Sequence, residues 1–108
     1  MVFMCTSMNL NVSDNIFYLI NQHIELFNSF DNIYLFGSVL NIEKPPNDID
    51  LLLIYSEYSN IIINDLNIIS SAFTKLSELS IDLTVLSVEE EKDTKFLKRL
   101  NSKYLKLK

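Results

Sequence analysis

The sequence has one cysteine, Cys5, so it cannot form a disulfide within the chain. It also has only one histidine, and this rules out the Cys/His clusters that hold structural zinc. Together these features predict a reducing, cytoplasmic setting. One glycine and two prolines leave little material for a flexible linker. We therefore expect a single domain over residues 1–108, with residues 1–12 poorly ordered.

Positive charge is scarce as well, because 9 Lys and Arg face 14 Asp and Glu, for a net charge of −5. That balance argues against a protein that binds nucleic acid or anionic membranes by neutralising phosphates. No apolar run approaches the ~20 residues that span a bilayer, and the first residues do not follow the pattern of a signal peptide. We expect no membrane and no direct nucleic-acid partner, and any bound nucleotide should arrive with its own cation.

Hydrophobic periodicity divides the chain into helices and strands. The predicted order is a helix 13–30 capped by Ser13, a strand 32–36, a loop, a strand 49–55, a helix 60–79, a strand 81–87, and a last helix from about 88 that includes residues 106 and 107. Pro45 and Pro46 must end any helical turn that starts after Ser38. The order predicts an α+β fold, a small mixed β-sheet of three or more strands with helices packed on one face.

Two of these segments allow more than one interpretation. The helix 60–79 has its expected apolar stripe at Ile61, Leu66, Ile69, Phe73 and Leu76, although three consecutive isoleucines at 61–63 also suit a strand. The last helix has acidic residues at its start and basic ones toward its end, which complements the helix dipole. Its apolar side is expected to close the core, or to form an oligomer or partner interface if it is only partly covered.

The stretch "YLFGSVLNIEKPPNDIDLLLIY" places the chain's one glycine and a serine, Gly37 and Ser38, where a strand should stop. Asp48 and Asp50 stand where the next strand should begin, and residues i and i+2 of a strand point to the same side. Two carboxylates so near each other repel and are best neutralised by a cation. A set of oxygen ligands suits Mg²⁺ or Mn²⁺. Asp82, near the start of a later strand, supplies a third carboxylate if the two strands are adjacent. Three such carboxylates can hold two ions that act on a triphosphate.

In combination, Gly37-Ser38, Asp48-x-Asp50 and the later Asp82 resemble the signature of the DNA polymerase β-type nucleotidyltransferase superfamily. The likeness covers residues 13–87 and is greatest to the minimal nucleotidyltransferases, which often act as antitoxins beside HEPN-domain toxins. It implies that the three aspartates bind metal and are catalytic, and that Gly37 and Ser38 hold the triphosphate. The implied reaction is transfer of AMP from ATP to a hydroxyl, with a tyrosine of the HEPN toxin as acceptor and Asp82 helping to activate it.

A second reading is a non-catalytic antitoxin that keeps this fold and neutralises its partner by direct contact. Members of the family commonly have Arg and Gly shortly after the Gly-Ser pair, whereas this chain has only Lys44 nearby. A transferase acting alone on a small molecule ranks third, because the chain is short for building its own substrate pocket.

Each candidate residue also has a purely structural reading. The aspartates at 48 and 50 could cap a turn, Gly37-Ser38 could end a strand, and Asp82 could mark a strand edge. His23 lies near an apolar helical stripe and is expected to pack rather than catalyse, and Cys5 is expected to act as a small hydrophobe. The combination of Gly-Ser with three acidic positions favours the functional reading.

Overall fold

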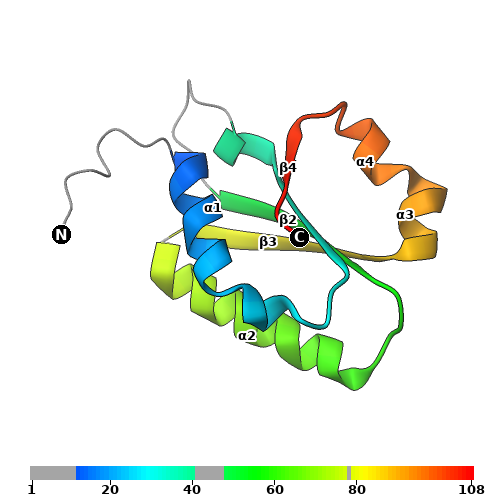
Figure 1. Ribbon diagram of the computed structural model, residues 1–108, viewed down its shortest axis with the longest axis horizontal. Coiled ribbons are helices and arrows are strands. Elements are labelled where there is room, and N and C mark those ends of the chain that lie inside the picture. Colours follow the sequence, from blue (N-terminus) through cyan, green and yellow to red (C-terminus); the bar gives the residue numbers. More distant parts are fainter. Residues whose placement is uncertain (1–11, 41–47, 78) are drawn as a thin grey trace.

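The computed structural model describes residues 12–40, 48–77 and 79–108 (Figure 1). The expectations for residues 1–11, including Cys5, and for the loop with Lys44, Pro45 and Pro46 lie outside the described residues. The elements in chain order are α1 (Val12–Gln22), the 3₁₀ helix η2 (Ile24–Phe27), β1 (Asn32–Phe36), the 3₁₀ helix η3 (Gly37–Leu40), β2 (Asp48–Tyr55), α2 (Asn60–Ser77), β3 (Ser80–Ser87), α3 (Val88–Thr94), α4 (Phe96–Arg99) and β4 (Tyr104–Lys106).

The strands form one mixed four-stranded sheet in the order β3-β2-β1-β4. β1 pairs antiparallel with both β2 and β4, while β2 and β3 are parallel and are joined by α2. A parallel pair needs such a crossover connection, and α2 supplies it. The predicted α+β fold with a small mixed sheet and packed helices is confirmed.

α1, η2 and α2 share a core with one face of the sheet. Alternate side chains of a strand point the same way, so every second residue of β1 and β2 points to that face, and most of these residues are fully buried. These strand residues are Ile33, Leu35, Ile49, Leu51 and Leu53. α1, η2 and α2 pack on them with Ile16, Ile20, Phe27, Ile62, Ile69 and Phe73. The acidic residues Asp48 and Asp50 alternate with these buried residues along β2. Burial of Ile49 and Leu51 therefore makes the two aspartates point to the opposite face of the sheet.

The first helix is shorter than predicted. It begins at Val12, so Ser13 lies in its first turn rather than ahead of it, and it ends at Gln22 instead of near residue 30. The chain then tightens into 3₁₀ geometry, in which the amide of Phe30 donates to the carbonyl of Phe27 at 3.0 Å. Both phenylalanines are buried, so packing in the core overrides the continued α-helical pattern. His23 packs edge-on against Phe73 with ring centroids 6.0 Å apart, as predicted.

α2 is a helix throughout, so the strand alternative for residues 61–63 is wrong. Its predicted stripe is right at Ile69 and Phe73 but wrong at both ends, where Ile61 and Leu76 are 62% and 50% exposed. Ile62 is buried in place of Ile61. None of the described helices combines the length and the hydrophobicity that crossing a membrane requires.

The predicted last helix is the largest error. α3 begins at Val88 and is capped by Ser87, whose hydroxyl accepts from the amide of Glu90 while the Glu90 side chain accepts from the amide of Ser87. Lys95 then adopts a left-handed conformation with φ 55° and ends that helix, and only one further turn, α4, follows. The remaining residues form β4 beside β1. The interruption places α4 over the sheet, where Phe96 packs against Phe36 with ring centroids 5.4 Å apart.

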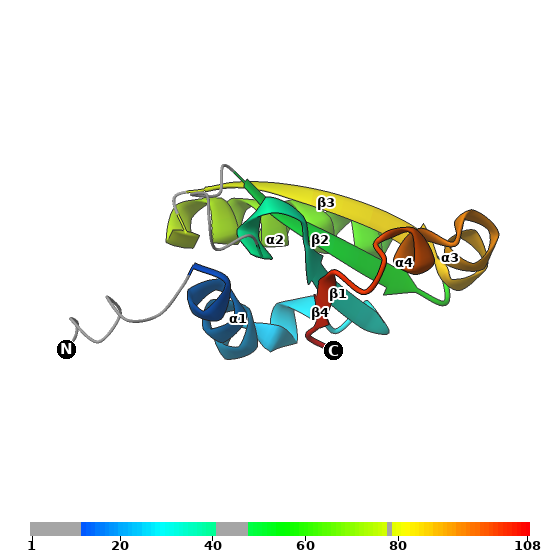
Figure 2. The same cartoon turned by 90° about the horizontal axis from the view of Figure 1, so that it is seen from above.

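The end of the described chain is held against the β1 side of the sheet. The ammonium group of Lys108 donates to the carbonyls of Phe27 at 3.1 Å and Phe30 at 2.7 Å, and the Lys108 carbonyl accepts from the amide of Ile33 at 3.2 Å. Figure 1 shows α3 and α4 at the opposite end of the molecule from α1, and Figure 2 shows the same separation from above. The contact between Phe96 and Phe36 puts α4 against the sheet face that carries Asp50.

Candidate functional site

Three aspartates lie together on the sheet face opposite the helical core. Asp48 and Asp50 open β2 and point to the same side, while the intervening Ile49 is fully buried on the other side. β3 is adjacent to β2, as the grouping of the aspartates requires, and Asp82 stands directly opposite Asp50 in the parallel register. The structure therefore brings together all three of the acidic residues that the sequence singled out.

Their carboxylates are close enough to share cations. One oxygen from each of Asp48, Asp50 and Asp82 lies within 4.8 Å of the others. Burial raises the pKa of Asp50 above its usual value of 3.8, and the charges of Asp48 and then Asp82 raise this pKa further. Three carboxylates this close repel one another, and a divalent cation bound between them would neutralise that repulsion. Oxygen donors of this kind suit a hard cation such as Mg²⁺ or Mn²⁺.

Gly37 lies directly against this acidic cluster. Its φ is +85°, a conformation that residues with a side chain rarely adopt. A Cβ built on it would stand 2.1 Å from Oδ2 of Asp50, so the backbone approaches the carboxylate as closely as glycine alone permits. The chain turns here from β1 into η3, which confirms the predicted strand end, and both Gly37 and Ser38 are exposed.

A row of side chains crosses the sheet at the level of Asp50. In register, Asp82 of β3 is opposite Asp50 of β2, Asp50 is opposite Phe36 of β1, and Phe36 is opposite Tyr104 of β4. Directly opposite residues on neighbouring strands point to the same face. The acidic cluster is therefore bordered by aromatic side chains, and Phe96 of α4 extends this border above Phe36.

The charge cluster should weaken the metal-free fold at neutral pH. Because the folded-state pKa of Asp50 is raised, its contribution to stability is fully present below the unfolded pKa and is lost as the pH rises through the folded value. In EDTA at pH 7 we expect Asp50→Asn to raise the denaturation midpoint, and the gain to disappear below about pH 4, near the unperturbed pKa. Urea titrations across pH test this.

With metal present, the effect of Asp50→Asn on stability should reverse, so that the variant becomes less stable than wild type. Added Mg²⁺ or Mn²⁺ should stabilise the wild-type protein by binding the folded state and should stabilise Asp50→Asn much less. An Asp50→Asn protein that is less stable than wild type at pH 7 in EDTA would contradict the repulsion that the geometry indicates.

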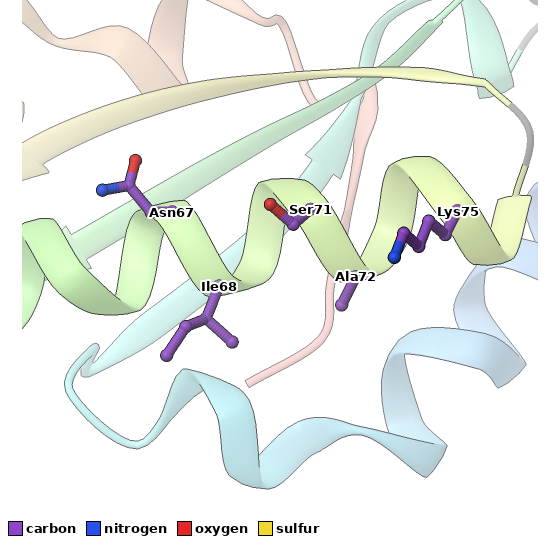
Figure 3. Close-up of a pocket in the computed structure, with 5 residues that line it drawn as sticks. All are labelled: Asn67, Ile68, Ser71, Ala72 and Lys75. Atoms are coloured by element: carbon purple, nitrogen blue, oxygen red, sulfur yellow. The ribbon is translucent and has the colours of Figure 1, made fainter.

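An open hollow of about 430 Å³ lies elsewhere, along α2. Its described lining consists of Asn67, Ile68, Ser71, Ala72 and Lys75 (Figure 3). Figure 3 shows Ile68 and Ala72 pointing toward the α1–η2 segment, while Asn67 points the other way. None of the three aspartates is in this lining, so the hollow is separate from the acidic cluster.

Comparison with solved structures identifies the fold. A crystal structure of the toxin-antitoxin pair MntA-HpeT, in a variant with two Asp-to-Glu substitutions, matches with a TM-score of 0.56 and 18% identity, covering 82% of this chain and 71% of the other. A toxin-antitoxin crystal structure with AMP-PNP matches with a TM-score of 0.55 and 21% identity, with the same coverage of 82% and 71%. The chain has the nucleotidyltransferase fold. At these identities the likeness extends to the nucleotidyltransferase fold alone.

A candidate nucleotidyltransferase from Sulfolobus solfataricus also matches, with a TM-score of 0.49 and 20% identity over 88% of this chain and 78% of the other. At that TM-score the likeness carries no argument. No protein-family model and no curated protein sequence matches the chain.

Proposed function

We propose that the protein is a metal-dependent nucleotidyltransferase that transfers AMP from ATP to a hydroxyl of a partner protein. The observation that carries the proposal is the convergence of Asp48, Asp50 and Asp82 beside Gly37 on one face of the sheet. The nucleotidyltransferase fold supports it, as does the AMP-PNP in one structure of similar fold. The reaction needs cellular ATP, so we place the protein in the cytoplasm.

The side chains have distinct parts in this proposal. The three aspartates would hold divalent ions, which when bound neutralise the triphosphate and lower the pKa of the attacking hydroxyl. The backbone amides at Gly37 and Ser38 and the hydroxyl of Ser38 would donate to phosphate oxygens, while the missing side chain of Gly37 leaves room for the Asp50 carboxylate. Asp82, the most exposed of the three aspartates, would take the proton of the acceptor hydroxyl.

The proposed reaction is a displacement at the α-phosphorus of ATP, with the acceptor hydroxyl as nucleophile and pyrophosphate as leaving group. The acceptor oxygen forms a bond to this phosphorus, the bond from the α-phosphorus to the bridging oxygen breaks, and pyrophosphate leaves with that oxygen. The hydroxyl proton passes to the Asp82 carboxylate and then to solvent. We propose a tyrosine of a HEPN-type toxin as acceptor; two solved structures of similar fold come from toxin-antitoxin pairs, which supports a toxin as the partner. Modification of the toxin would make this protein an antitoxin.

The test is transfer of label from α-³²P-ATP to the partner toxin, comparing wild type with Asp48→Asn/Asp50→Asn. We expect transfer to fall by at least about 10³-fold, because the variant loses two of the three anionic ligands. Size-exclusion chromatography should show that it still binds the partner. Unchanged transfer would refute the proposal.

The non-catalytic alternative makes the opposite prediction for neutralisation. If the protein acts by contact alone, a variant with all three aspartates changed to asparagine should protect cells from the toxin as well as wild type does. If it acts by transfer, that variant should bind the toxin and fail to protect.

A further inference from the structure

We propose that Arg99 binds the polyphosphate tail of the nucleotide at the aspartate site. The inference rests on the proposed function and adds a residue to it that lies far along the chain from Asp48-x-Asp50. Arg99 is the one arginine in the sequence, and it is the last residue of α4.

Aromatic contacts connect Arg99 to the site. Its guanidinium carbon lies 5.8 Å from the centre of the Phe96 ring. The Phe96 ring packs against Phe36 at 5.4 Å, and Phe36 stands directly opposite Asp50 on the same face of the sheet. Phe36 also immediately precedes Gly37, whose backbone touches the Asp50 carboxylate. Two ring contacts therefore link Arg99 to Phe36, the neighbour of Asp50 on β1.

The charge at the site calls for such a group. Three carboxylates offset most of the charge of two divalent ions, which leaves the oxygens of a triphosphate in need of further cations. The described residues nearest the aspartates, Gly37–Leu40 and the first residues of β2, include no lysine or arginine. α4, which packs on the sheet beside Asp50 through Phe96 and Phe36, ends in Arg99.

Arginine is suited to this part in two ways. Its planar fork of donors matches phosphate geometry and can donate two hydrogen bonds to one phosphate group. Stacking on Phe96 restricts its side chain beforehand, so less conformational freedom is lost when phosphate binds. Arg99 is exposed, so the edge of the guanidinium is accessible to a ligand.

A purely structural part for Arg99 would be to hold α4 on the sheet through Phe96. The two readings differ in what a substitution changes. Loss of a structural contact lowers stability and reduces the affinity for every ligand of the site alike. Loss of a phosphate contact reduces the affinity most for the ligands that carry the most phosphates.

The experiment titrates the full chain with ATP and with AMP in Mg²⁺, for wild type, Arg99→Gln, Arg99→Lys and Lys98→Gln. Lys98→Gln is the matched control, since it removes the same charge from the neighbouring exposed position of α4. We expect Arg99→Gln to weaken ATP binding by about tenfold or more, in the range of a lost charged hydrogen bond, and AMP binding by less than about twofold. Arg99→Lys should fall between, and Lys98→Gln should weaken ATP by less than about threefold.

An unchanged ratio of ATP to AMP affinity in Arg99→Gln, or an equal loss in Lys98→Gln, would overturn the assignment of Arg99 and leave the proposed function standing. A wild-type protein that binds no ATP in Mg²⁺ would instead overturn the proposed function and this inference with it. Arg99→Lys keeps a cation above Phe96, so it decides the question if Arg99→Gln folds poorly. In that case a normal ATP to AMP ratio in Arg99→Lys counts against the fork geometry and overturns the proposal.

Discussion

Gly37→Ala should disable the site and destabilise the protein at once. The added Cβ would stand 2.1 Å from Oδ2 and 3.0 Å from Cγ of Asp50, so the carboxylate must leave its place in the cluster. The φ of +85° adds a backbone penalty of about 1–2 kcal/mol for any residue with a side chain. We expect the affinity for Mn²⁺ to fall by more than about tenfold and the denaturation midpoint to drop. Urea unfolding and metal titration measure the two effects.

A double-mutant cycle separates the two causes. Asp50→Ala removes the atoms nearest the new Cβ, so Gly37→Ala should destabilise the Asp50→Ala protein less than it destabilises wild type. If the two substitutions are strictly additive, Gly37 does not constrain Asp50, and its closeness to the cluster has no functional meaning.

Asp82→Asn should stop the chemistry while sparing nucleotide binding. Asparagine has nearly the shape of aspartate but cannot accept the proton of the acceptor hydroxyl, and general-base catalysis is commonly worth about 10²–10⁴-fold. We therefore expect the single-turnover rate of transfer to fall by at least about 10²-fold and the ATP dissociation constant to change by only a few-fold. Quench-flow transfer assays and calorimetry report these two quantities separately.

The matched control for this variant is Asp93→Asn, which removes the same charge from an exposed position of α3 and should leave the rate within about twofold. If Asp82→Asn abolishes ATP binding as fully as changing Asp48 and Asp50 does, Asp82 is a ligand of the nucleotide's metal rather than the base. An unchanged transfer rate would remove it from the machinery altogether.

The acidic cluster could be predicted because its information is local. Asp48-x-Asp50 fixes two carboxylates on one side of a strand wherever that strand goes, and Gly37 marks a turn that residues with a side chain rarely make. Only the adjacency of β3 was left open, and the structure confirms it by pairing Asp50 with Asp82. The catalytic and binding parts assigned to these residues remain predictions.

The C-terminal part could not be predicted because tertiary contacts decide it. Residues 88–103 have helical spacing, yet the helix breaks at Lys95, where the chain adopts a left-handed conformation that no glycine or proline announces. The break lets Phe96 reach Phe36 and lets Tyr104 pair beside β1. The aromatic border of the site and the position of Arg99 follow from that break, which is why the sequence gives no sign of them. The Ser87-x-x-Glu90 capping box, by contrast, is a signal that could have been found.

The end of α1 and the exposed ends of the α2 stripe were mispredicted for a similar reason. The tight turn before β1 is set by burial of Phe27 and Phe30, and the rotation of α2 is set by Ile62 rather than Ile61. Periodicity identifies a helix and its approximate face, but the core decides which residue of two neighbours is buried.

The most direct test of a metal-dependent nucleotide site is calorimetric titration of the purified protein with ATP, once in Mg²⁺ and once in EDTA, repeated on Asp48→Asn/Asp50→Asn. The account predicts binding to the wild-type protein in Mg²⁺ and loss of that binding both in EDTA and in the double variant. Binding of equal strength without the metal, or by the variant, would contradict it, because the nucleotide would then be held by something other than the acidic cluster.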